Sequence, residues 1–365
     1  MLIKEIKVAE LPDFVKSDFW QQLIPKPITE LRAISQFHNP RANASDVALI
    51  IAYENQNLIG LVGLFPNLIN GQAGQTAYSN SCWWAHPKKG KQLAIPLFLK
   101  AFALCSQRMF MTDCTPHTKS ILEKTNWFEF PNTNPGTRGF MKFNLHEIIP
   151  VKLPSTRKLT PLLKLIDQMF NFVLSPYRKV VSFRFNQNIL TVEQPTSLNE
   201  ELYTFIDNHS QNEFSRRSGK ELEWIMQFPW IKTKNDDQPT TSIKYPFSYI
   251  VESFEQYFIK ITSSDLTIGL LFISVRDGHM KVPYAYFNEK DAHKILKVIY
   301  QQAMLKNVIT LTVFCPQLVD VMDSVPHPFI FRKKIKRLMA ISKQLSDLYQ
   351  KYPQMQDGDG DVVFT

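Results

Sequence analysis

The segment that decides the fold is "WWAHPKKGKQLAIPLFLKAFAL", residues 83–104. It opens with the apolar end of a predicted strand, passes through a basic loop with one glycine, and continues into apolar residues at helical spacing over residues 93–107. The first N–H groups of a helix have no internal partners and carry partial positive charge. The loop therefore predicts an anion site suited to phosphate, although a solvated turn has the same composition.

The residues around this segment predict an α+β domain. Residues 46–69 indicate a β-hairpin, because two apolar runs flank Glu54-Asn55-Gln56-Asn57, which favour a turn. Residues 71–86 predict the next strand, and residues 138–148 a closing strand. The order expected over residues 1–150 is β, α, β, β, β, α, β, α, β, which is a mixed central sheet flanked by helices.

The second half of the chain repeats this order without residue identity. Helices are expected at 198–211, 218–231, 289–307 and 316–324, successive strands over 247–287, and further strands at 308–315 and 329–342. The tail "DGDGDVVFT" predicts a turn and a final edge strand. The chain is accordingly divided into a domain at 1–150, a basic linker helix at 151–180, and a second domain at 181–365.

Length and composition support two domains in a cytoplasmic protein. A chain of 365 residues exceeds one ordinary core. Its four cysteines form no CxxC pair and no cluster with zinc spacing, so we expect reduced thiols and no metal site. The N-terminus has no apolar signal region, and no stretch reaches the roughly 18 apolar residues of a membrane span. No integral membrane segment is expected.

The net charge of +9 is unevenly distributed. Residues 151–180 hold six Lys/Arg and one Asp, whereas residues 181–365 are neutral. No nucleic-acid-binding motif accompanies the charge, so no nucleic-acid partner is expected; an acidic small molecule or an anionic membrane surface would suit the same charge. Thr160 is expected to cap the linker helix, with Pro161 at its first position. The favoured interpretation is a connector packed on both domains, and the alternative is a basic helix that touches a membrane.

The loop Pro87-Lys88-Lys89-Gly90-Lys91-Gln92-Leu93-Ala94 resembles the coenzyme A loop of the GNAT acetyltransferases. When the loop is matched to the family's pattern, Lys89 takes the place of the pattern's basic residue, Gly90 that of its first glycine and Ala94 that of its last small residue. The stretch "TPHTKSILEKTNWF" resembles the helix that follows the fifth strand in this family. The resemblance implies two fused GNAT-like domains.

The same resemblance implies which residues hold acetyl-CoA or another acyl-CoA. The backbone of Lys89, Gly90, Lys91, Gln92, Leu93 and Ala94 would hold its pyrophosphate, and the thioester would lie near Trp84 and Ala85.

Several residues depart from the family pattern. Gln92 replaces a glycine, Leu122 occupies the place of the tyrosine that protonates the leaving thiolate, and Thr115 replaces an asparagine. His117 is a candidate proton shuttle, although a surface histidine at a helix start is the more common role. In the second half, Glu289 and Asp291 would repel a pyrophosphate, which makes that copy degenerate.

The expected function is acyl-CoA-dependent N-acyl transfer, with acetyl transfer to a small-molecule or sugar amine as the leading case. Aminosugars, polyamines and peptide amines all fit as acceptors. The alternatives are a non-catalytic tandem protein that binds a ligand or partner and, ranked lower, a FemABX-like peptidyl transferase, because the long helical hairpin of that family is not seen.

Overall fold

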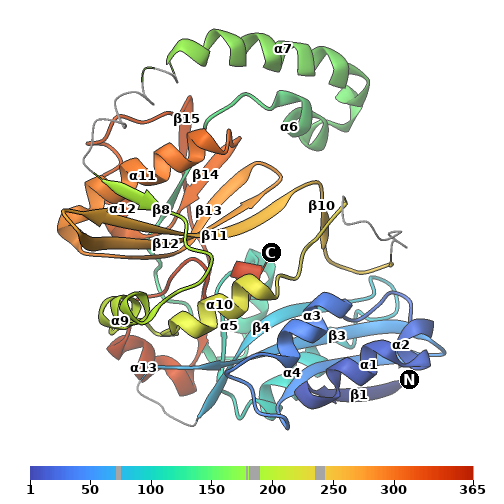
Figure 1. Cartoon of the computed structure of the whole chain (residues 1–365). Coiled ribbons are helices and arrows are strands. Elements are labelled where there is room, and N and C mark those ends of the chain that lie inside the picture. The colour runs from blue at the N-terminus through green and yellow to red at the C-terminus, as the bar shows by residue number, and fades with distance from the viewer. Residues whose placement is uncertain (71–74, 178–179, 181–189, 235–242, 365) are drawn as a thin grey trace. The chain divides into compact units, whose positions relative to one another are not determined.

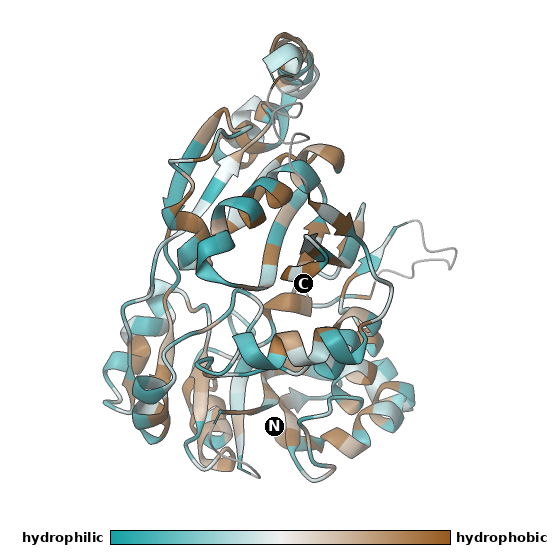
Figure 2. Cartoon of the chain, turned by 60° about the vertical axis from the view of Figure 1, so that its left-hand side comes forward, coloured by the Kyte–Doolittle hydropathy of each residue, from teal (hydrophilic) through white to brown (hydrophobic). Residues whose placement is uncertain are grey.

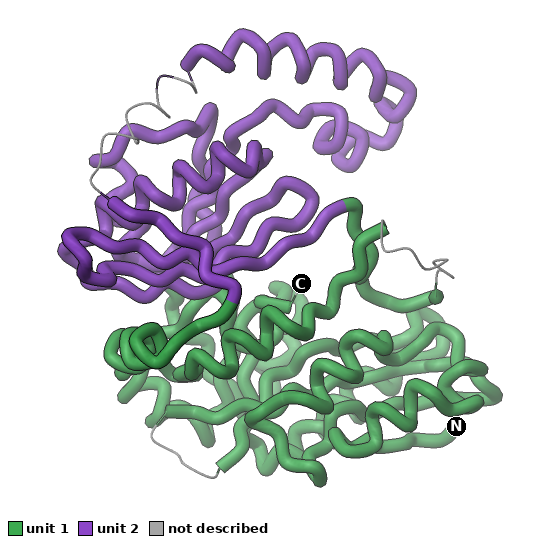
Figure 3. The backbone as a smooth tube through the Cα atoms, in the orientation of Figure 1, with its two compact units in different colours: residues 1–133, 197–252, 337–365 green, residues 134–196, 253–336 purple. Residues whose placement is uncertain are grey.

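The structure is a computed structural model that describes residues 1–70, 75–177, 180, 190–234 and 243–364. The chain forms two compact units, each assembled from separate stretches of sequence (Figure 3). Unit 1 takes residues 1–133, 197–252 and 337–365, and unit 2 takes residues 134–196 and 253–336. These units differ from the contiguous domains at 1–150 and 181–365, because the chain passes between the units several times. Residues 151–180 fall within unit 2.

Unit 1 is built on a mixed sheet that has seven strands among the described residues (Figure 1). In spatial order these are β1 (Leu2–Lys7), β2 (Val47–Glu54), β3 (Asn57–Leu68), β4 (Thr76–Ala85), β5 (Met109–Met111), β16 (Ala340–Ser342) and β6 (Phe128–Glu129). The β2–β3 turn lies where the sequence predicts it. Asn55 and Gln56 adopt φ values of 42° and 66°, the left-handed conformation of a tight hairpin turn.

Helices cover both faces of this sheet because buried side chains alternate along its strands. Leu49 and Ile51 point to the cluster that contains Phe14, whereas Ile50 and Ala52 point to the cluster that contains Phe98. The first face carries α1 (Leu11–Lys16), α2 (Asp18–Gln22) and α3 (Glu30–Phe37); the second carries α4 (Ala94–Leu104) and α5 (Pro116–Glu123). Unit 1 also includes α9 (Glu200–His209), α10 (Gly219–Gln227) and α13 (Ser346–Lys351).

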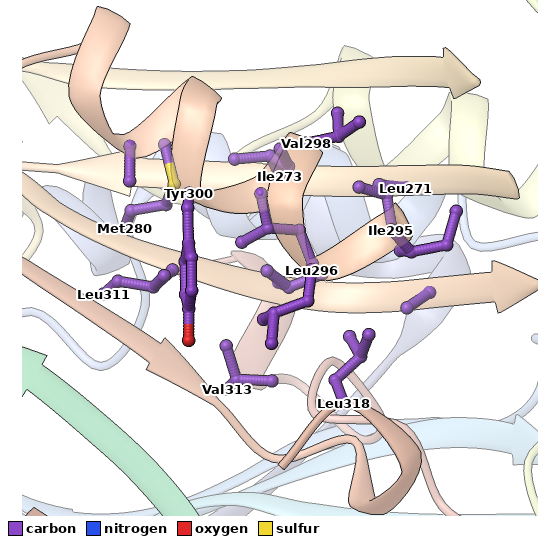
Figure 4. Packing of buried hydrophobic residues seen from close by; sticks show 14 of the residues in the cluster. Leu271, Ile273, Met280, Ile295, Leu296, Val298, Tyr300, Leu311, Val313 and Leu318 are labelled. Carbon is purple, nitrogen blue, oxygen red and sulfur yellow. The ribbon is translucent and has the colours of Figure 1, made fainter. Parts of the chain in front are cut away.

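The sheet of unit 2 also has seven strands within the described ranges. In spatial order they are β8 (Thr191–Glu193), β11 (Phe254–Ser263), β12 (Leu266–Arg276), β13 (His279–Phe287), β14 (Thr310–Val313), β7 (Gly136–Phe140) and β15 (Phe331–Ile335). The remaining helices include α11 (Ala292–Leu305) and α12 (Pro316–Asp320). Figure 4 shows Ile295 and Leu296 of α11 in the cluster with Leu271 and Leu311 of the sheet. The α+β class predicted from the sequence is confirmed.

Each sheet receives one strand from the other half of the sequence. The predicted closing strand of the first half, seen as β7, pairs with β14 and β15 in unit 2. The strand expected over residues 329–342 is divided in two: β15 stays in unit 2, and β16 pairs with β5 and β6 in unit 1. Apolar alternation predicts that a segment is a strand but not which sheet it joins, so the sequence could not show this exchange.

The C-terminal tail corrects a second expectation. Residues 357–361 form a turn, and a short 3-10 helix, η5 (Val362–Phe364), replaces the predicted edge strand. Arg337 pairs with the buried Asp357, and the Gln356 N–H donates to Asp359 Oδ2 at 2.9 Å. These bonds hold the acidic segment in a turn.

The surface pattern of the helices agrees with their packing. In Figure 2 helices carry both teal and brown segments, as expected when one side of a helix faces a sheet and the other faces solvent. Among the residues that the structure describes, no helix is both long and apolar enough to cross a membrane.

Candidate functional site

Strand β4 leaves its neighbour β5 partway along its length. The two strands run parallel and pair only at Tyr78 with Met109 and at Ser79 with Phe110. β4 then continues to Ala85 while it pairs with β3 on its other side. Among the described residues, the backbone of residues 80–85 therefore has no strand partner on the β5 side, where an extended polar chain could make the missing strand contacts.

A β-bulge lies just beyond this point. Gly63 pairs with Cys82 and Leu64 with Asn80, so Ser81 is an extra residue in β4. A bulge redirects the side chains that follow it. Cys82 and Trp84 thus join the core beneath α1–α3, whereas Trp83 packs on the α4 side and stacks on Phe98 at 4.7 Å.

The basic loop lies between β4 and α4, as predicted, and its glycine is required by backbone crowding. A Cβ on Gly90 would lie 2.4 Å from the Ile59 carbonyl oxygen and 2.6 Å from the His86 nitrogen. Gly90 N–H donates to the His86 carbonyl at 2.8 Å. Lys88, Lys89 and Lys91 remain exposed around it.

Most of the predicted phosphate-binding N–H groups already have partners. His86 Nδ1 accepts from the N–H groups of Lys88 and Lys89 at 3.2 Å each. The Gly90 carbonyl accepts from Leu93 and Ala94 at 2.9 and 3.1 Å. Within the described residues, the Lys91 and Gln92 N–H groups have no hydrogen-bond partner. The loop thus offers two open amides, and two more are covered by one imidazole.

A buried polar cluster lies on the other side of β4, at the bulge. Arg32 of α3, which is 6% exposed, donates to Ser81 Oγ at 2.6 Å and to the Tyr245 hydroxyl at 3.2 Å. Its guanidinium carbon lies 4.2 Å from the ring centroid of Trp230. Arg32 Nε and Trp230 Nε1 are buried donors with no partner in the part of the chain that the structure describes. Unpaired donors of this kind are costly unless a ligand or water satisfies them.

The C-terminal turn brings Asp361 to this cluster. Burial raises the pKa of Asp361 to about 6, although the nearby Arg32 charge opposes the shift. The adjacent Gly360 has φ +74°, and a Cβ there would lie 3.0 Å from Thr112 Oγ1 and 3.7 Å from Ser79 Cβ. Since Thr112 follows β5 and Ser79 is the last residue of β4 paired with it, the turn lies where the two strands part.

Buried contacts hold the tail in this position. The fully buried Arg217 donates from Nη2 to the Gly360 carbonyl at 3.1 Å. The backbone N–H of Trp230 donates to the Phe364 carbonyl at 3.1 Å. Phe364 stacks on Trp230 at 4.7 Å. The Arg217 side chain therefore lies inside unit 1 and holds the tail there.

The other residues singled out from the sequence lie apart from this cluster or in the core. His117 is exposed in the first turn of α5, whose N-cap is Thr115. Leu122, at the position of the family tyrosine, is fully buried in the core beneath α4. Sequence reasoning missed Arg32, Tyr245 and Asp361. No short motif joins them, because they come from three distant segments.

The fold is the tandem fold of the GCN5-related N-acetyltransferases. The structure matches, with a TM-score of 0.50, a conserved protein from Enterococcus faecalis V583 described as a probable N-acyltransferase. The match covers 96% of this chain and 74% of that one at 12% identity, so it supports the fold alone.

Two further solved structures are similar at lower scores. A GCN5-related N-acetyltransferase from Anabaena variabilis has a TM-score of 0.43 at 9% identity, with 93% of this chain and 72% of that chain covered. A GCN5-related glucosamine N-acetyltransferase region of a fungal multi-domain β-N-acetylglucosaminidase has a TM-score of 0.47 at 9% identity, with coverage of 93% and 38%. No protein-family model and no curated protein sequence matches this chain.

Proposed function

We propose that the chain is an acyl-CoA-dependent N-acyltransferase that reacts at the β4 bulge of unit 1. The observation that carries this proposal is the position of Asp361, a carboxylate with pKa raised to about 6, where β4 parts from β5. A base that titrates near neutral pH is suited to take a proton from an amine.

The coenzyme is assigned to the loop and to the open edge of β4. The Lys91 and Gln92 amides and the ammonium groups of Lys88, Lys89 and Lys91 hold its diphosphate, and Leu93 and Ala94 begin the helix behind it. The backbone of residues 80–85, including Trp84 and Ala85, holds the arm that leads to the thioester. The coenzyme supplies the acyl group as a thioester, whose C–S bond breaks as the amide C–N bond forms.

The remaining steps belong to side chains of the cluster. Asp361 accepts the proton that the acceptor amine loses, and Arg32 keeps that carboxylate ionised at neutral pH. The Tyr245 phenol stays neutral because burial raises its pKa, and it donates the proton that the leaving thiolate takes up. Tyr245 thereby takes the role of the family's tyrosine that protonates the leaving thiolate; in this chain Leu122 occupies the sequence position of that tyrosine. His117 receives no role in this scheme because it is exposed on α5.

The acceptor is a small-molecule amine, with a sugar amine among the candidates and a cytoplasmic setting. We assign the second copy a structural role. Its β13–α11 connection holds the short helix η3 (Glu289–Asp291) in place of a glycine loop, and Asp291 is buried at the start of α11.

The proposal is tested by titrating acetyl-CoA calorimetrically and measuring thiol release with aminosugar, polyamine and peptide amines. We expect binding and turnover, and we expect Asp361→Asn to lower the rate by roughly 10²–10⁴ while coenzyme affinity is kept. Asp265→Asn, an exposed turn position in unit 2, is the control.

A non-catalytic coenzyme binder is the second candidate, and Leu122 favours it because a buried leucine occupies the place of the family's tyrosine. Coenzyme binding without thiol release from any amine would identify that binder. The absence of both binding and release would overturn the two assignments together.

A further inference from the structure

Helices α6 (Leu145–Lys152) and α7 (Thr160–Val173), joined by the 3-10 helix η2 (Pro154–Leu159), form a hairpin in unit 2 (Figure 1). Asp167 of α7 is 3% exposed and accepts from the N–H groups of Leu145 and His146 at 2.9 and 3.0 Å. The His146 imidazole lies 2.8 Å from the same carboxylate. Asn171 bonds the backbone of Phe143 with both ends of its amide, at 3.0 and 2.9 Å.

These bonds turn the polar side of α7 inward and leave its apolar side exposed. Phe172 is 80% exposed, Val173 71% and Met169 63%, and Leu165 and Leu162 are each more than half exposed. The spacing of these five residues places them on one face of the helix. A helix that packs as a connector would bury this face, so the favoured connector interpretation does not account for it. The helix also begins at Thr160 itself, with Leu159 as its N-cap, so the predicted Thr160 cap is wrong by one residue.

Cations accompany the exposed apolar face. Lys152, Arg157, Lys158 and Lys164 are all exposed in the hairpin. The Asp167 carboxylate is hydrogen-bonded within the hairpin, whereas Glu147, near the start of α6, is exposed. Val151, 81% exposed, and Leu153, 58% exposed, are further exposed apolar residues of the hairpin and flank Lys152 in the sequence. Large apolar side chains interleaved with cations match the boundary between lipid headgroups and acyl chains.

We propose that the α6–α7 hairpin binds the surface of an anionic membrane. The apolar side chains of α7 enter the headgroup boundary, while the four cations contact lipid phosphates. The helix lies on the membrane and does not cross it. The proposal is independent of the acyltransferase assignment, because it uses no residue of unit 1.

Vesicle flotation with the full-length chain tests the proposal. We expect binding to vesicles that contain phosphatidylglycerol, weak binding to phosphatidylcholine alone, and loss of binding as salt is raised. Arg157→Gln and Lys158→Gln should each weaken binding about fivefold. Met169→Ser combined with Phe172→Ser should weaken it by at least about tenfold. Leu305→Ser, a substitution at an exposed apolar residue of α11, is the matched control and should leave binding unchanged.

Circular dichroism establishes that each variant is folded, and sedimentation analysis determines its oligomeric state. Absence of binding to the anionic vesicles by the folded wild-type chain would overturn the proposal. The proposal would also be wrong if the wild-type chain is a dimer and the combined Met169 and Phe172 substitutions make it monomeric without changing vesicle binding. The apolar face would then be a contact between two copies.

Discussion

Arg32 donates a hydrogen bond of 2.6 Å to the Ser81 hydroxyl, so a buried guanidinium from α3 is fixed at the bulge of β4. The same charge opposes the burial that raises the pKa of Asp361. The balance of the two effects puts the pKa of Asp361 at about 6, above the pKa of an ordinary aspartate and below the value that burial without Arg32 would give.

The first prediction concerns the pH dependence of turnover. Because the proposed function requires ionised Asp361 as the base, kcat/KM should rise as pH increases through about 6. Arg32→Gln removes the charge that lowers this pKa, so the rising limb should move to higher pH, as measured by thiol release across pH. Asp265→Asn, at an exposed turn of unit 2, should leave the profile in place. If the rising limb of kcat/KM in folded Arg32→Gln stays at the wild-type pH, Asp361 is not the base that titrates.

The second prediction concerns the imidazole that covers two loop amides. His86→Ala frees the N–H groups of Lys88 and Lys89 for the coenzyme diphosphate. Coenzyme binding should tighten about two- to tenfold, the worth of one or two hydrogen bonds, as measured by calorimetry. Weaker binding by a folded variant would mean that His86 itself contacts the ligand.

The third prediction concerns the loop backbone. In Gly90→Ala the new methyl group meets two backbone atoms at 2.4 and 2.6 Å, neither of which can rotate away. The free energy of unfolding should fall by about 1–3 kcal/mol in urea denaturation. Lys91→Ala, next in the chain and exposed, should keep the stability and weaken coenzyme binding alone. Equal stabilities for Gly90→Ala and the wild type would contradict the packing described here.

The fourth prediction concerns a buried acid beneath the tail. Burial and the neighbouring Asp359 raise the pKa of Glu213 to about 8, while Gln356 donates to its Oε1 at 2.8 Å. Between the ordinary pKa of a glutamate and about 8, Glu213 therefore keeps its proton in the folded chain and loses it in the unfolded chain. The stabilisation by neutral Glu213 is present at low pH and is lost as pH rises towards 8, by up to about 1.4 kcal/mol per pH unit.

Glu213→Gln keeps a neutral, hydrogen-bonding side chain at every pH. The variant should therefore gain stability relative to the wild type between pH 5 and pH 8, where unfolding is followed by denaturant titration. Glu129→Gln, an exposed position of unit 1, is the control. A constant difference between wild type and Glu213→Gln over this range would show that Glu213 titrates normally.

The sequence predicts local elements better than it predicts the site. The turn at Asn55 and Gln56 and the strand–loop–helix around Gly90 both depend on neighbouring residues, and the structure contains each of them. The meeting of Arg32, Tyr245 and Asp361 depends on three segments that converge only in the folded chain. Asp361 was further obscured because an acidic, glycine-rich tail has the composition of a solvated turn.

The exchange of β7 and β16 affects how the chain folds as it is made. Residues 136–140 leave the ribosome before their partners at 310–313 and 331–335 exist, and the first sheet lacks residues 340–342 long after its other strands are made. The nascent first half therefore exposes an unfilled sheet edge until residues 340–342 emerge. The segment after residue 336 completes that sheet and also brings Asp361 to Arg32, so the buried cluster forms only after both halves of the chain have been made.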